Sequence, residues 1–357
     1  MSATRHCLVV GAGVAGAAIA RALADKGWQV DVADQAHAPA AGASAVPIGV
    51  LSCHVSVDDN PLSKLTRKGL LLVKAFAEHH LVQGQDWLAC GVLERRLDGH
   101  TKKKTWQPAL MKPVWHGWVT TPTATQLAQA GLKEIQAHEP LWQPQGAWIK
   151  PQSLIKALLN HTSIHFQGGQ SLRAPEIQAL GYPAVVLALG AHTSDFLAAL
   201  PHVPALPLVP VAGQISWGLQ DAAQANALPP FAVNGYGGFV SGVPTAEGLA
   251  WYSGATFHRG QAQAEVTVQD HAENFLKLQQ LLPQAAHALQ NQWRTPNQLK
   301  AWSGVRCTSV NRMPIATALD PVKLPTWYVL TAFGSRGLTL AMACAERLAL
   351  EIDLRSD

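Results

Sequence analysis

Three glycines close to the start of the sequence have the spacing of a turn that binds phosphate. Gly11, Gly13 and Gly16 form the pattern G-x-G-x-x-G. Gly11 permits a tight turn, Gly13 lets a pyrophosphate approach the backbone, and Gly16 lets a helix and a strand pack closely. Asp34 follows at about the distance expected of a carboxylate that binds ribose hydroxyls. The motif predicts a dinucleotide site, and the alternative is a glycine-rich structural turn.

The segments around these glycines have the pattern of a βαβ unit. An apolar run at residues 6–10 precedes the turn, and an alanine-rich segment follows it and stops at Gly27. Residues 28–34 form a second β-rich run that ends in the acid. The phosphates would lie on free amides at the helix N-terminus. An acid at the end of the second strand disfavours NADP and fits NAD or FAD equally.

Later segments return to the same domain. Residues 184–190 form a buried strand ending in glycine, as expected where a parallel strand meets a cofactor. A strand at 327–332, a glycine turn at 334–337 and a helix at 338–350 close the sequence. This helix directs a second positive dipole end at an anion. The dipole favours a flavin over a nicotinamide, because the reduced flavin carries negative charge at its N1/C2 carbonyl edge.

The composition is that of a well-buried globular enzyme. The 357 residues are 48% hydrophobic and 14% charged, and this length predicts two lobes. A net charge of +4 permits a polyanionic partner without requiring one. The odd number of scattered cysteines and the absence of metal-binding histidine spacing argue against a disulfide scaffold or a metal site. Prolines interrupt the uncharged run at 196–220, so we expect a cytoplasmic protein with no membrane segment.

The residue composition changes in two stretches that lie between the dinucleotide-binding segments. The first stretch contains tryptophans and short β-like segments. The second follows a proline-rich linker that ends at Pro210, and strands are expected in it at 213–217, 238–240 and 251–256. Helices are expected at 62–80, with a solvated basic face, and at 270–282. The predicted domains are residues 1–80, 148–205 and 300–357 for the cofactor, and 81–147 and 206–299 for the substrate.

Basic residues lie among the tryptophans of the first of these stretches. The run Lys102-Lys103-Lys104 and the arginines Arg95, Arg96 and Arg312 are candidates for a surface that contacts RNA. Interleaved basic and aromatic residues bind single-stranded nucleic acid by charge and stacking. Tryptophan is equally good core material, so the alternative is an ordinary packed domain.

Several blocks of the sequence, taken in order, resemble the D-amino-acid-oxidase-like family of FAD enzymes. They are the N-terminal fingerprint and the segments 185–190, 213–214, 254–260, 304–307 with Pro314, and 333–338. Within this family the blocks at 258–260, 304–307 and 334–338 look most like the oxidoreductase half of bifunctional tRNA-modifying enzymes. The likeness covers nearly the whole sequence.

The resemblance implies a fold, a cofactor and a reaction. The fold is α/β, with a glutathione-reductase-type, Rossmann-like FAD domain interleaved with an antiparallel-sheet substrate domain. The reaction is oxidation of the glycine-like amine of 5-carboxymethylaminomethyl-uridine at the wobble position of tRNA, which releases glyoxylate and leaves the aminomethyl base. The methyltransferase half is not part of the resemblance, so we expect any later methylation to need a separate methyltransferase.

The resemblance also implies site residues. Arg306 matches the arginine that pairs with the substrate carboxylate in glycine oxidases of the family, and a guanidinium suits such a pair; a structural ion pair is the alternative. Arg336 is the second candidate. Tyr252 or Tyr236 could supply a hydroxyl, and an ordinary strand tyrosine is the alternative for either. The expected cofactor-binding residues are Gly11, Gly13, Gly16, Asp34, Gly42, Ser44, Gly190, Gly334, Ser335, Gly337 and Leu338.

Other residues near these blocks leave alternatives open. Cys307 aligns near a cysteine that binds flavin covalently in some sarcosine oxidases, and a buried thiol is the other reading. His258 and Arg259 face either the tRNA or the site. The family tends to have a polar Asn-Arg-Gln-Gly sequence where this chain has Val-Pro-Ile-Gly at 46–49. The subfamily commonly has Arg-Asp-His before Leu-Pro where this chain has Val-Asn-Arg at 310–312 before Met-Pro. Both departures bear on the substrate.

Three functions are therefore compatible with the sequence. The first is a tRNA-modifying FAD oxidoreductase. The second is an oxidase of free glycine, sarcosine or a similar small amine, which needs no RNA surface. The third is a flavin-binding protein without catalysis, suggested by the apolar residues at 46–48.

Overall fold

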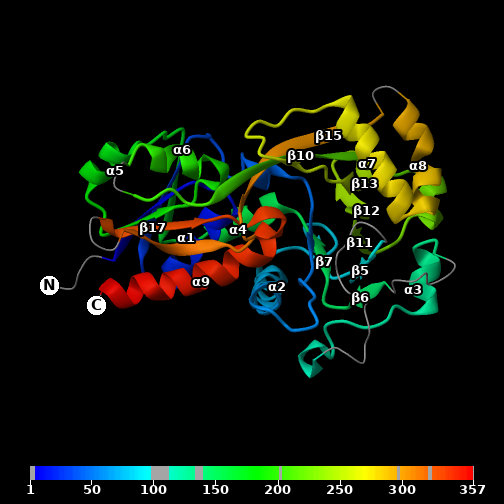
Figure 1. The fold of residues 1–357 in the computed structure, drawn as a ribbon, viewed down its shortest axis with the longest axis horizontal. Coiled ribbons are helices and arrows are strands. Elements are labelled where there is room, and N and C mark those ends of the chain that lie inside the picture. Colours follow the sequence, from blue (N-terminus) through cyan, green and yellow to red (C-terminus); the bar gives the residue numbers. More distant parts are fainter. Residues whose placement is uncertain are drawn as a thin grey trace.

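The computed structural model describes residues 5–97, 112–132, 140–200, 203–295, 298–320 and 324–356. Figure 1 shows two lobes, one around α1, α9 and β17 and the other around α7, α8 and strands β10 to β13. Among the described residues the strands form sheets of six, eight and three members. The α/β fold class predicted from the sequence is confirmed.

The first lobe is built on the six-stranded sheet, in the order β16-β17-β9-β1-β2-β8. All neighbours are parallel except β16, which runs antiparallel to β17. The strands are β1 (His6–Val10), β2 (Gln29–Asp34), β8 (Ile164–Gly168), β9 (Ala184–Leu187), β16 (Ile315–Asp320) and β17 (Leu324–Thr331). The helices of this lobe are α1 (Val14–Ala24), α2 (Pro61–His80), α4 (Pro151–Leu159), α5 (Ala174–Leu180), α6 (Thr193–Ala198) and α9 (Gly337–Ser356).

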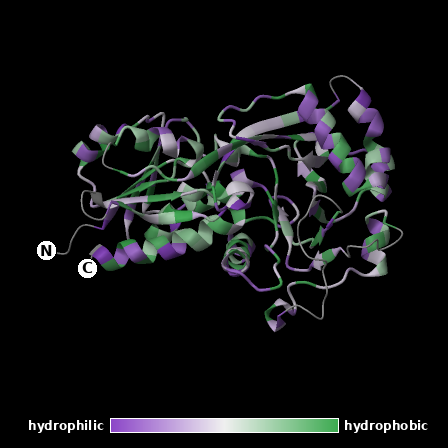
Figure 2. Cartoon of the chain, in the orientation of Figure 1, coloured by the Kyte–Doolittle hydropathy of each residue, from purple (hydrophilic) through white to green (hydrophobic). Residues whose placement is uncertain are grey.

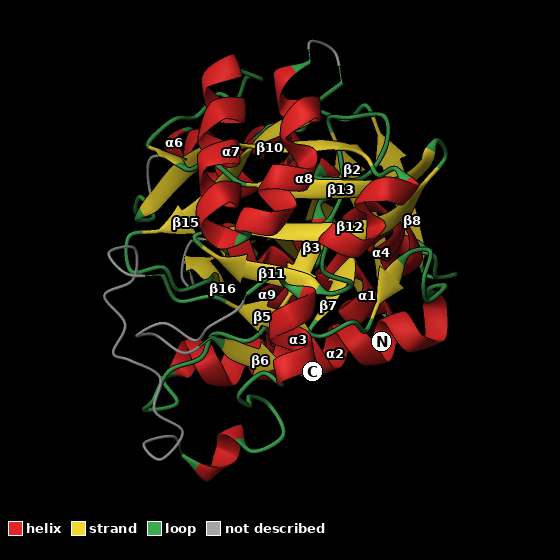
Figure 3. Ribbon diagram, turned by 90° about the vertical axis from the view of Figure 1, so that its right-hand side faces the viewer, coloured by secondary structure: helices red, strands yellow, loops and turns green. Residues whose placement is uncertain are grey.

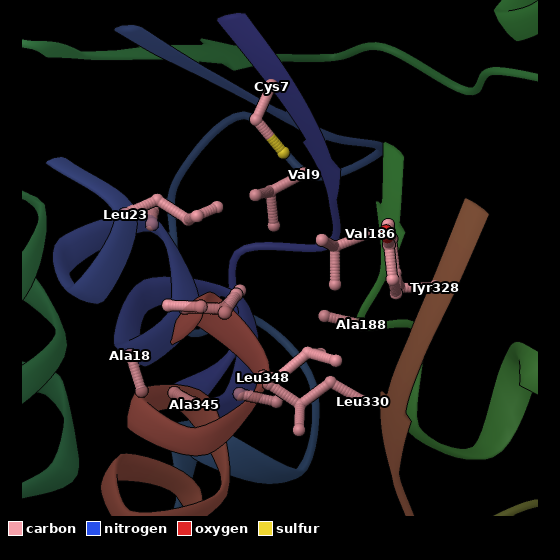
Figure 4. Close-up of a cluster of buried hydrophobic side chains, with 14 of the residues drawn as sticks. Cys7, Val9, Ala18, Leu23, Val186, Ala188, Tyr328, Leu330, Ala345 and Leu348 are labelled. Atoms are coloured by element: carbon pink, nitrogen blue, oxygen red, sulfur yellow. The ribbon is translucent and has the colours of Figure 1, made fainter. Parts of the chain in front are cut away.

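Apolar strands and alanine-rich helices form the core of this lobe. Helices α1 and α9 pack against the sheet, and the small side chains of Ala18 and Ala345 let them approach closely (Figure 4). The strand residues Val9, Val186 and Leu330 belong to the same cluster and are fully buried. The strands of this sheet are strongly hydrophobic in Figure 2, as expected of a parallel sheet covered on both faces.

The second lobe is built on the eight-stranded sheet, in the order β14-β10-β13-β12-β11-β5-β6, with β15 paired to β10. Every pairing is antiparallel except that of β11 with β5. The strands are β5 (Val92–Glu94), β6 (Leu141–Gln143), β10 (Leu208–Leu219), β11 (Ala232–Gly235), β12 (Gly237–Thr245), β13 (Gly248–Gly254), β14 (His258–Arg259) and β15 (Lys300–Ser309).

Helices α7 (Val268–Leu281) and α8 (Pro283–Arg294) cover one face of this sheet, as Figure 3 shows. Their apolar residues pack against Leu93, Val233, Phe239 and Trp251 of the strands. The opposite face carries Val92, Ala232, Val240 and Tyr252. This opposite face also packs against Ile48 and Trp148.

Shorter elements connect the lobes. A three-stranded antiparallel sheet joins β3 (Gly49–Leu51), β7 (Ala147–Ile149) and β4 (Trp87–Leu88). Helix α3 (Ala124–Gln129) lies in the second lobe. The short 3-10 helices are η1 (Ala43–Ala45), η3 (Pro113–Trp115), η4 (Gly190–His192), η5 (Ala222–Ala227) and η6 (Gly334–Arg336).

Three details differ from the sequence-based expectations. The proline-rich linker ends earlier than expected, because β10 begins at Leu208 and includes Pro210. Helix α8 was not predicted, although Pro283 at its first turn is a usual helix start. The basic face of α2 is not simply solvated, since Arg67 is buried. The domain boundaries remain a prediction. The predicted boundaries put β15 in the cofactor domain, whereas β15 pairs along β10 of the second sheet.

Candidate active site

The glycine turn between β1 and α1 is shaped by the backbone. Gly11 has φ +107°, and a Cβ there would lie 2.5 Å from the carbonyl oxygen of Ala188. A Cβ on Gly16 would collide with the carbonyl oxygen of Gly11. A Cβ on Gly13 would meet only Ser44 Oγ, at 3.2 Å. Packing of the chain therefore requires Gly11 and Gly16, whereas Gly13 leaves bare backbone toward which a pyrophosphate fits.

Asp34 lies at the end of β2, beside this turn. Its Oδ2 accepts a hydrogen bond from the amide of Ala12 at 2.6 Å, and its Oδ1 accepts one from the amide of Ala36 at 2.8 Å. These bonds fix the carboxylate at the end of the turn. A carboxylate has lone pairs beyond the two used here, so ribose hydroxyls can still donate to it.

A second helix N-terminus lies next to the first. A Cβ on Gly337, the first residue of α9, would lie 3.4 Å from Val14 Cγ1 at the start of α1. Both helices therefore direct their positive ends toward one region. Ser44 Oγ accepts from the amide of Val14 at 3.0 Å and joins η1 to this region. Two positive dipole ends suit a cofactor with charge at more than one place, as FAD has.

The other predicted cofactor residues surround the same place. Elements η1, η4 and η6 all contact β15. Gly190 O accepts from Thr193 Oγ1 at 2.8 Å, and Gly334 has φ +58° in the turn before α9. Leu338 packs so closely on Gly49 that a Cβ there would collide with it. Ser335 is exposed and Gly42 has open space around it, so neither is required by packing. We refer to Gly11, Gly13, Gly16, Asp34, Ser44 and η6 as the cofactor cradle.

The open face of the antiparallel sheet carries the predicted substrate residues. Ile215 pairs in register with Trp302 of β15 and with Gly254 of β13, and Trp217 pairs with Tyr252. Because side chains alternate along a strand, Trp302 and Arg306 share the face of Tyr252. We refer to this side of the sheet, opposite α7 and α8, as the substrate face.

Arg306 is a partly buried cation on the substrate face. Its Nη2 donates to the carbonyl oxygen of Thr256 at 2.9 Å, and its Cζ lies 4.3 Å from the centroid of the Phe257 ring. Its Nε is buried without a hydrogen-bond partner, and no acidic side chain of the described residues pairs with it. Burial lowers the pKa of Arg306 to about 10, so the group is charged at neutral pH. A buried guanidinium with an unused donor fits a ligand carboxylate.

Tyr252 lies deeper on the same face. It is 6% exposed, and its ring stacks on Trp217 with the centroids 5.4 Å apart. Burial raises the pKa of Tyr252 to about 12, which keeps the phenol protonated at neutral pH. It can therefore donate a hydrogen bond but cannot serve as a base there.

Arg336 reaches the region from the turn before α9. Burial lowers the pKa of Arg336, the nearby carboxylate of Glu94 opposes this, and Arg312 adds to it. Glu94 accepts hydrogen bonds from Gln143 Nε2 at 2.9 Å and from Arg96 Nε at 3.3 Å. Arg336 and Arg306 thus differ, because only Arg336 has a carboxylate as its electrostatic partner.

Glu94, Gln143 and Arg96 form a cluster that was not predicted from the sequence. The positions of Arg96 and Arg95 correct the expectation that both belong to an RNA surface. Arg96 is 8% exposed and belongs to this cluster, so it is not part of a free RNA surface. Arg95 donates to the carbonyl oxygens of Gln280 and Leu281 at the end of α7. The alternation of Val92, Glu94 and Arg96, along β5 and just beyond its end, was the available signal, because it places charges on an otherwise buried face. Arg312 is exposed, and Lys102-Lys103-Lys104 lies outside the described residues.

The apolar segment at 46–48 packs against the substrate face. Val46 and Ile48 belong to the cluster that contains Ile215, Val240 and Tyr252. This packing gives the departure from the family pattern a structural role as an apolar wall.

Two neighbouring residues point elsewhere. Cys307 is buried, and burial raises the pKa of its thiol, which makes it a poor nucleophile. His258 Nε2 lies 2.6 Å from Asp270 Oδ1 of α7, on the far side of the sheet from Arg306. Arg259 is exposed and pairs in register with Val211, which also pairs with Arg306.

Within the described ranges, no group of three or more potential metal ligands gathers in one place. No helix among those residues has both the length and the apolar content needed to cross a bilayer.

Comparisons with known proteins agree on the family. The family model described as FAD dependent oxidoreductase matches residues 6–350. The chain is 39% identical to the tRNA 5-methylaminomethyl-2-thiouridine biosynthesis bifunctional protein MnmC of Paracidovorax citrulli, over 96% of this chain and 56% of that protein. The protein of the same name from Polaromonas naphthalenivorans is 38% identical, over 98% of this chain and 57% of its own length. The chain thus spans about half the length of these curated relatives.

Solved structures show the same fold at low identity. Glycine oxidase from Geobacillus kaustophilus aligns with a TM-score of 0.74 and 18% identity, over 99% of this chain and 96% of that one. L-proline dehydrogenase from P. horikoshii aligns with a TM-score of 0.75 and 16% identity, over 99% and 95%. The cofactor predicted from the glycine turns is confirmed as FAD by the family model, and the chain belongs to the FAD-dependent oxidoreductase family of D-amino-acid-oxidase-like enzymes.

Proposed function

We propose that this enzyme oxidises the CH–NH group of 5-carboxymethylaminomethyl-uridine at the wobble position of tRNA. The products are glyoxylate and aminomethyl-uridine. Two curated relatives named for tRNA 5-methylaminomethyl-2-thiouridine biosynthesis support the tRNA substrate. The observation that carries the proposal is the partly buried Arg306, whose buried Nε has no hydrogen-bond partner among the described residues.

The substrate arm needs a cationic partner for its carboxylate and a fixed position for its reacting carbon. The arm ends in a carboxylate, which Arg306 would bind through a charge-assisted pair. Arg336 adds positive charge nearby, although the carboxylate of Glu94 partly offsets it. With the carboxylate fixed at Arg306, the adjacent carbon is held at one distance from the cofactor cradle. Holding a reacting carbon in this way is the main contribution of a protein to such chemistry.

The protein residues then serve to bind, orient and exclude water. When bound, FAD would supply the redox chemistry by taking up a hydride from the carbon between the amine and the carboxylate. The amine nitrogen loses its proton, and water hydrolyses the resulting C=N bond to release glyoxylate and leave the aminomethyl base. Tyr252 stays protonated and can only donate a hydrogen bond. Val46 and Ile48 form an apolar wall that limits water on the substrate face.

Oxidation of a free small amine is the second candidate. Arg306 would bind the carboxylate of glycine or sarcosine as well as that of the modified base, and glycine oxidase shares the fold. A flavin-binding protein without catalysis has no use for an unpaired buried arginine, which costs stability.

The test presents the purified holoenzyme with two substrates. One is tRNA that carries 5-carboxymethylaminomethyl-uridine, and the other is free glycine or sarcosine; glyoxylate is measured in both. We expect glyoxylate from the tRNA, with at least about tenfold less from glycine at equal concentration. Faster turnover of the free amine would favour the small-amine oxidase. Turnover of neither would favour a binding protein.

A further inference from the structure

Phe257 is a large apolar residue at the rim of the substrate face. It lies between β13 and β14 and is 52% exposed. Single exposed apolar residues are common on protein surfaces, so it is the contacts of Phe257 that distinguish it. Nothing in the reaction proposed above uses this ring.

Two cations hold the loop that presents Phe257. Lys277 Nζ donates to the carbonyl oxygen of Ala255 at 2.9 Å, and Arg306 Nη2 donates to that of Thr256 at 2.9 Å. Lys277 is itself 5% exposed and pairs with Glu273. The two residues before Phe257 are therefore anchored from α7 on one side and from β15 on the other.

The same cations contact the ring. Arg306 Cζ lies 4.3 Å from the Phe257 centroid and Lys277 Nζ lies 5.6 Å from it. Cation–π contacts of this kind fix the position of a ring. More than half of the surface of Phe257 nevertheless remains open to solvent. The result is an aromatic surface held rigidly next to the proposed carboxylate anchor.

We propose that Phe257 is the platform on which the pyrimidine ring of the substrate stacks while its carboxylate arm reaches Arg306. This inference rests on the proposed function, since a free amino acid has no ring to stack. Proteins that recognise unpaired RNA bases commonly stack them on aromatic side chains. The exposed Arg259, two residues along the chain, adds positive charge at the same rim for the adjoining phosphates.

Binding measurements on the holoenzyme separate the ring from the carboxylate. The two probes are the nucleoside 5-carboxymethylaminomethyl-uridine and glycolate, a small carboxylate without a ring. Both are titrated without oxygen into holoenzyme whose FAD has been reduced beforehand, so that the nucleoside binds but is not oxidised. Phe257→Leu keeps an apolar cover over Arg306 but removes the aromatic face. We expect it to raise the Kd of the nucleoside at least about fivefold, the lower end of base–aromatic stacking, and that of glycolate less than about twofold. Phe257→Tyr should keep both affinities.

Leu249→Ala is the matched control, because Leu249 is also an exposed apolar residue, 48% exposed, on β13. It should change neither affinity. Equal weakening of both probes by Phe257→Leu would mean that the ring only covers Arg306 and would overturn the platform. Unchanged nucleoside binding in Phe257→Leu would also overturn it. Failure of the wild-type protein to bind the nucleoside while it binds glycolate would instead overturn the proposed tRNA substrate, and the platform with it.

Discussion

The cofactor cradle and the substrate face are built from different chemical groups. The cradle is mainly backbone: Gly11 and Gly16 fit only because they lack a Cβ, and helix termini supply its charge. The substrate face is made of side chains, among them Arg306, Tyr252 and Glu94, on strands far apart in the sequence. We infer that few substitutions in the cradle are compatible with the fold. Substitutions on the substrate face should leave the fold intact and impair substrate binding or turnover.

The largest expected effect is at Gly13. Gly13→Val should abolish FAD binding and leave the fold intact, because only Ser44 Oγ lies near its Cβ position. Gly16→Val should lose the fold as well, since its Cβ meets backbone. Flavin absorbance and circular dichroism of the two variants measure this difference. A Gly13→Val protein that keeps one FAD would show that the pyrophosphate does not lie there.

The next effect is at Arg306. Arg306→Met should lower kcat/KM by about 30- to 800-fold, which corresponds to about 2–4 kcal/mol for a desolvated charge pair. Flavin should remain bound, and Arg306→Lys should recover part of the activity. Arg173→Met, which removes an exposed arginine paired with Glu176, is the control. Unchanged flavin reduction in Arg306→Met would make Arg306 structural.

Stability distinguishes Arg306 from a paired buried arginine. Arg67 forms a two-bond pair with Asp59, at 2.6 and 3.1 Å, and lies 4.4 Å over the Trp115 ring. Arg67→Met should cost about 3 kcal/mol, because it leaves Asp59 without its partner. Arg306→Met should cost only about 1 kcal/mol, because it removes a hydrogen bond to the carbonyl oxygen of Thr256 but leaves no carboxylate without its partner. Urea unfolding measures both, and an equal loss would contradict the unpaired state of Arg306.

The pH dependence of glycolate binding reports the same group. Burial lowers the pKa of Arg306 to about 10, so the anchor is charged below this pH and loses its charge above it. Glycolate itself does not titrate in that range. Its Kd should stay constant from about pH 7 to 9 and rise above about pH 10. Because bound glycolate favours the charged form, the pKa of Arg306 is higher in the complex, and the rise in Kd levels off there. A Kd that rises already between pH 7 and 8 would point to another group.

The smallest effect is expected at Tyr252. Tyr252→Phe should lower kcat less than about tenfold, since the hydroxyl can donate one hydrogen bond but has a pKa of about 12. The shape of the pH–rate profile between pH 6 and 10 should not change. Loss of a limb of that profile would assign Tyr252 a role in proton transfer.

The cradle could be predicted from the sequence because its determinants are local. Gly11, Gly13 and Gly16 are close neighbours, and Asp34 follows within the same βαβ unit. The structure brings the second glycine turn, around Gly334, to the same place as expected. Its role in binding FAD stays a prediction for each residue.

The substrate face could be predicted only in part. Arg306 and Tyr252 were proposed through family resemblance, but strand pairing decides which side chains share a face, and pairing between distant segments leaves little trace in one sequence. Glu94 and Arg96 were therefore missed as a buried cluster, and Phe257 was not singled out. The charge of Arg95 suggested an RNA surface, whereas the side chain binds the end of α7.

We propose that a backbone cradle for FAD and an arginine on the substrate face together act on a wobble base. Mass spectrometry of tRNA nucleosides after incubation with wild-type protein and with Arg306→Met tests it most directly. We predict that the wild type converts 5-carboxymethylaminomethyl-uridine into aminomethyl-uridine and that the variant, still carrying FAD, does so at least about 30-fold more slowly. Unchanged nucleosides with the FAD-loaded wild type, or equal conversion by both proteins, would contradict the claim.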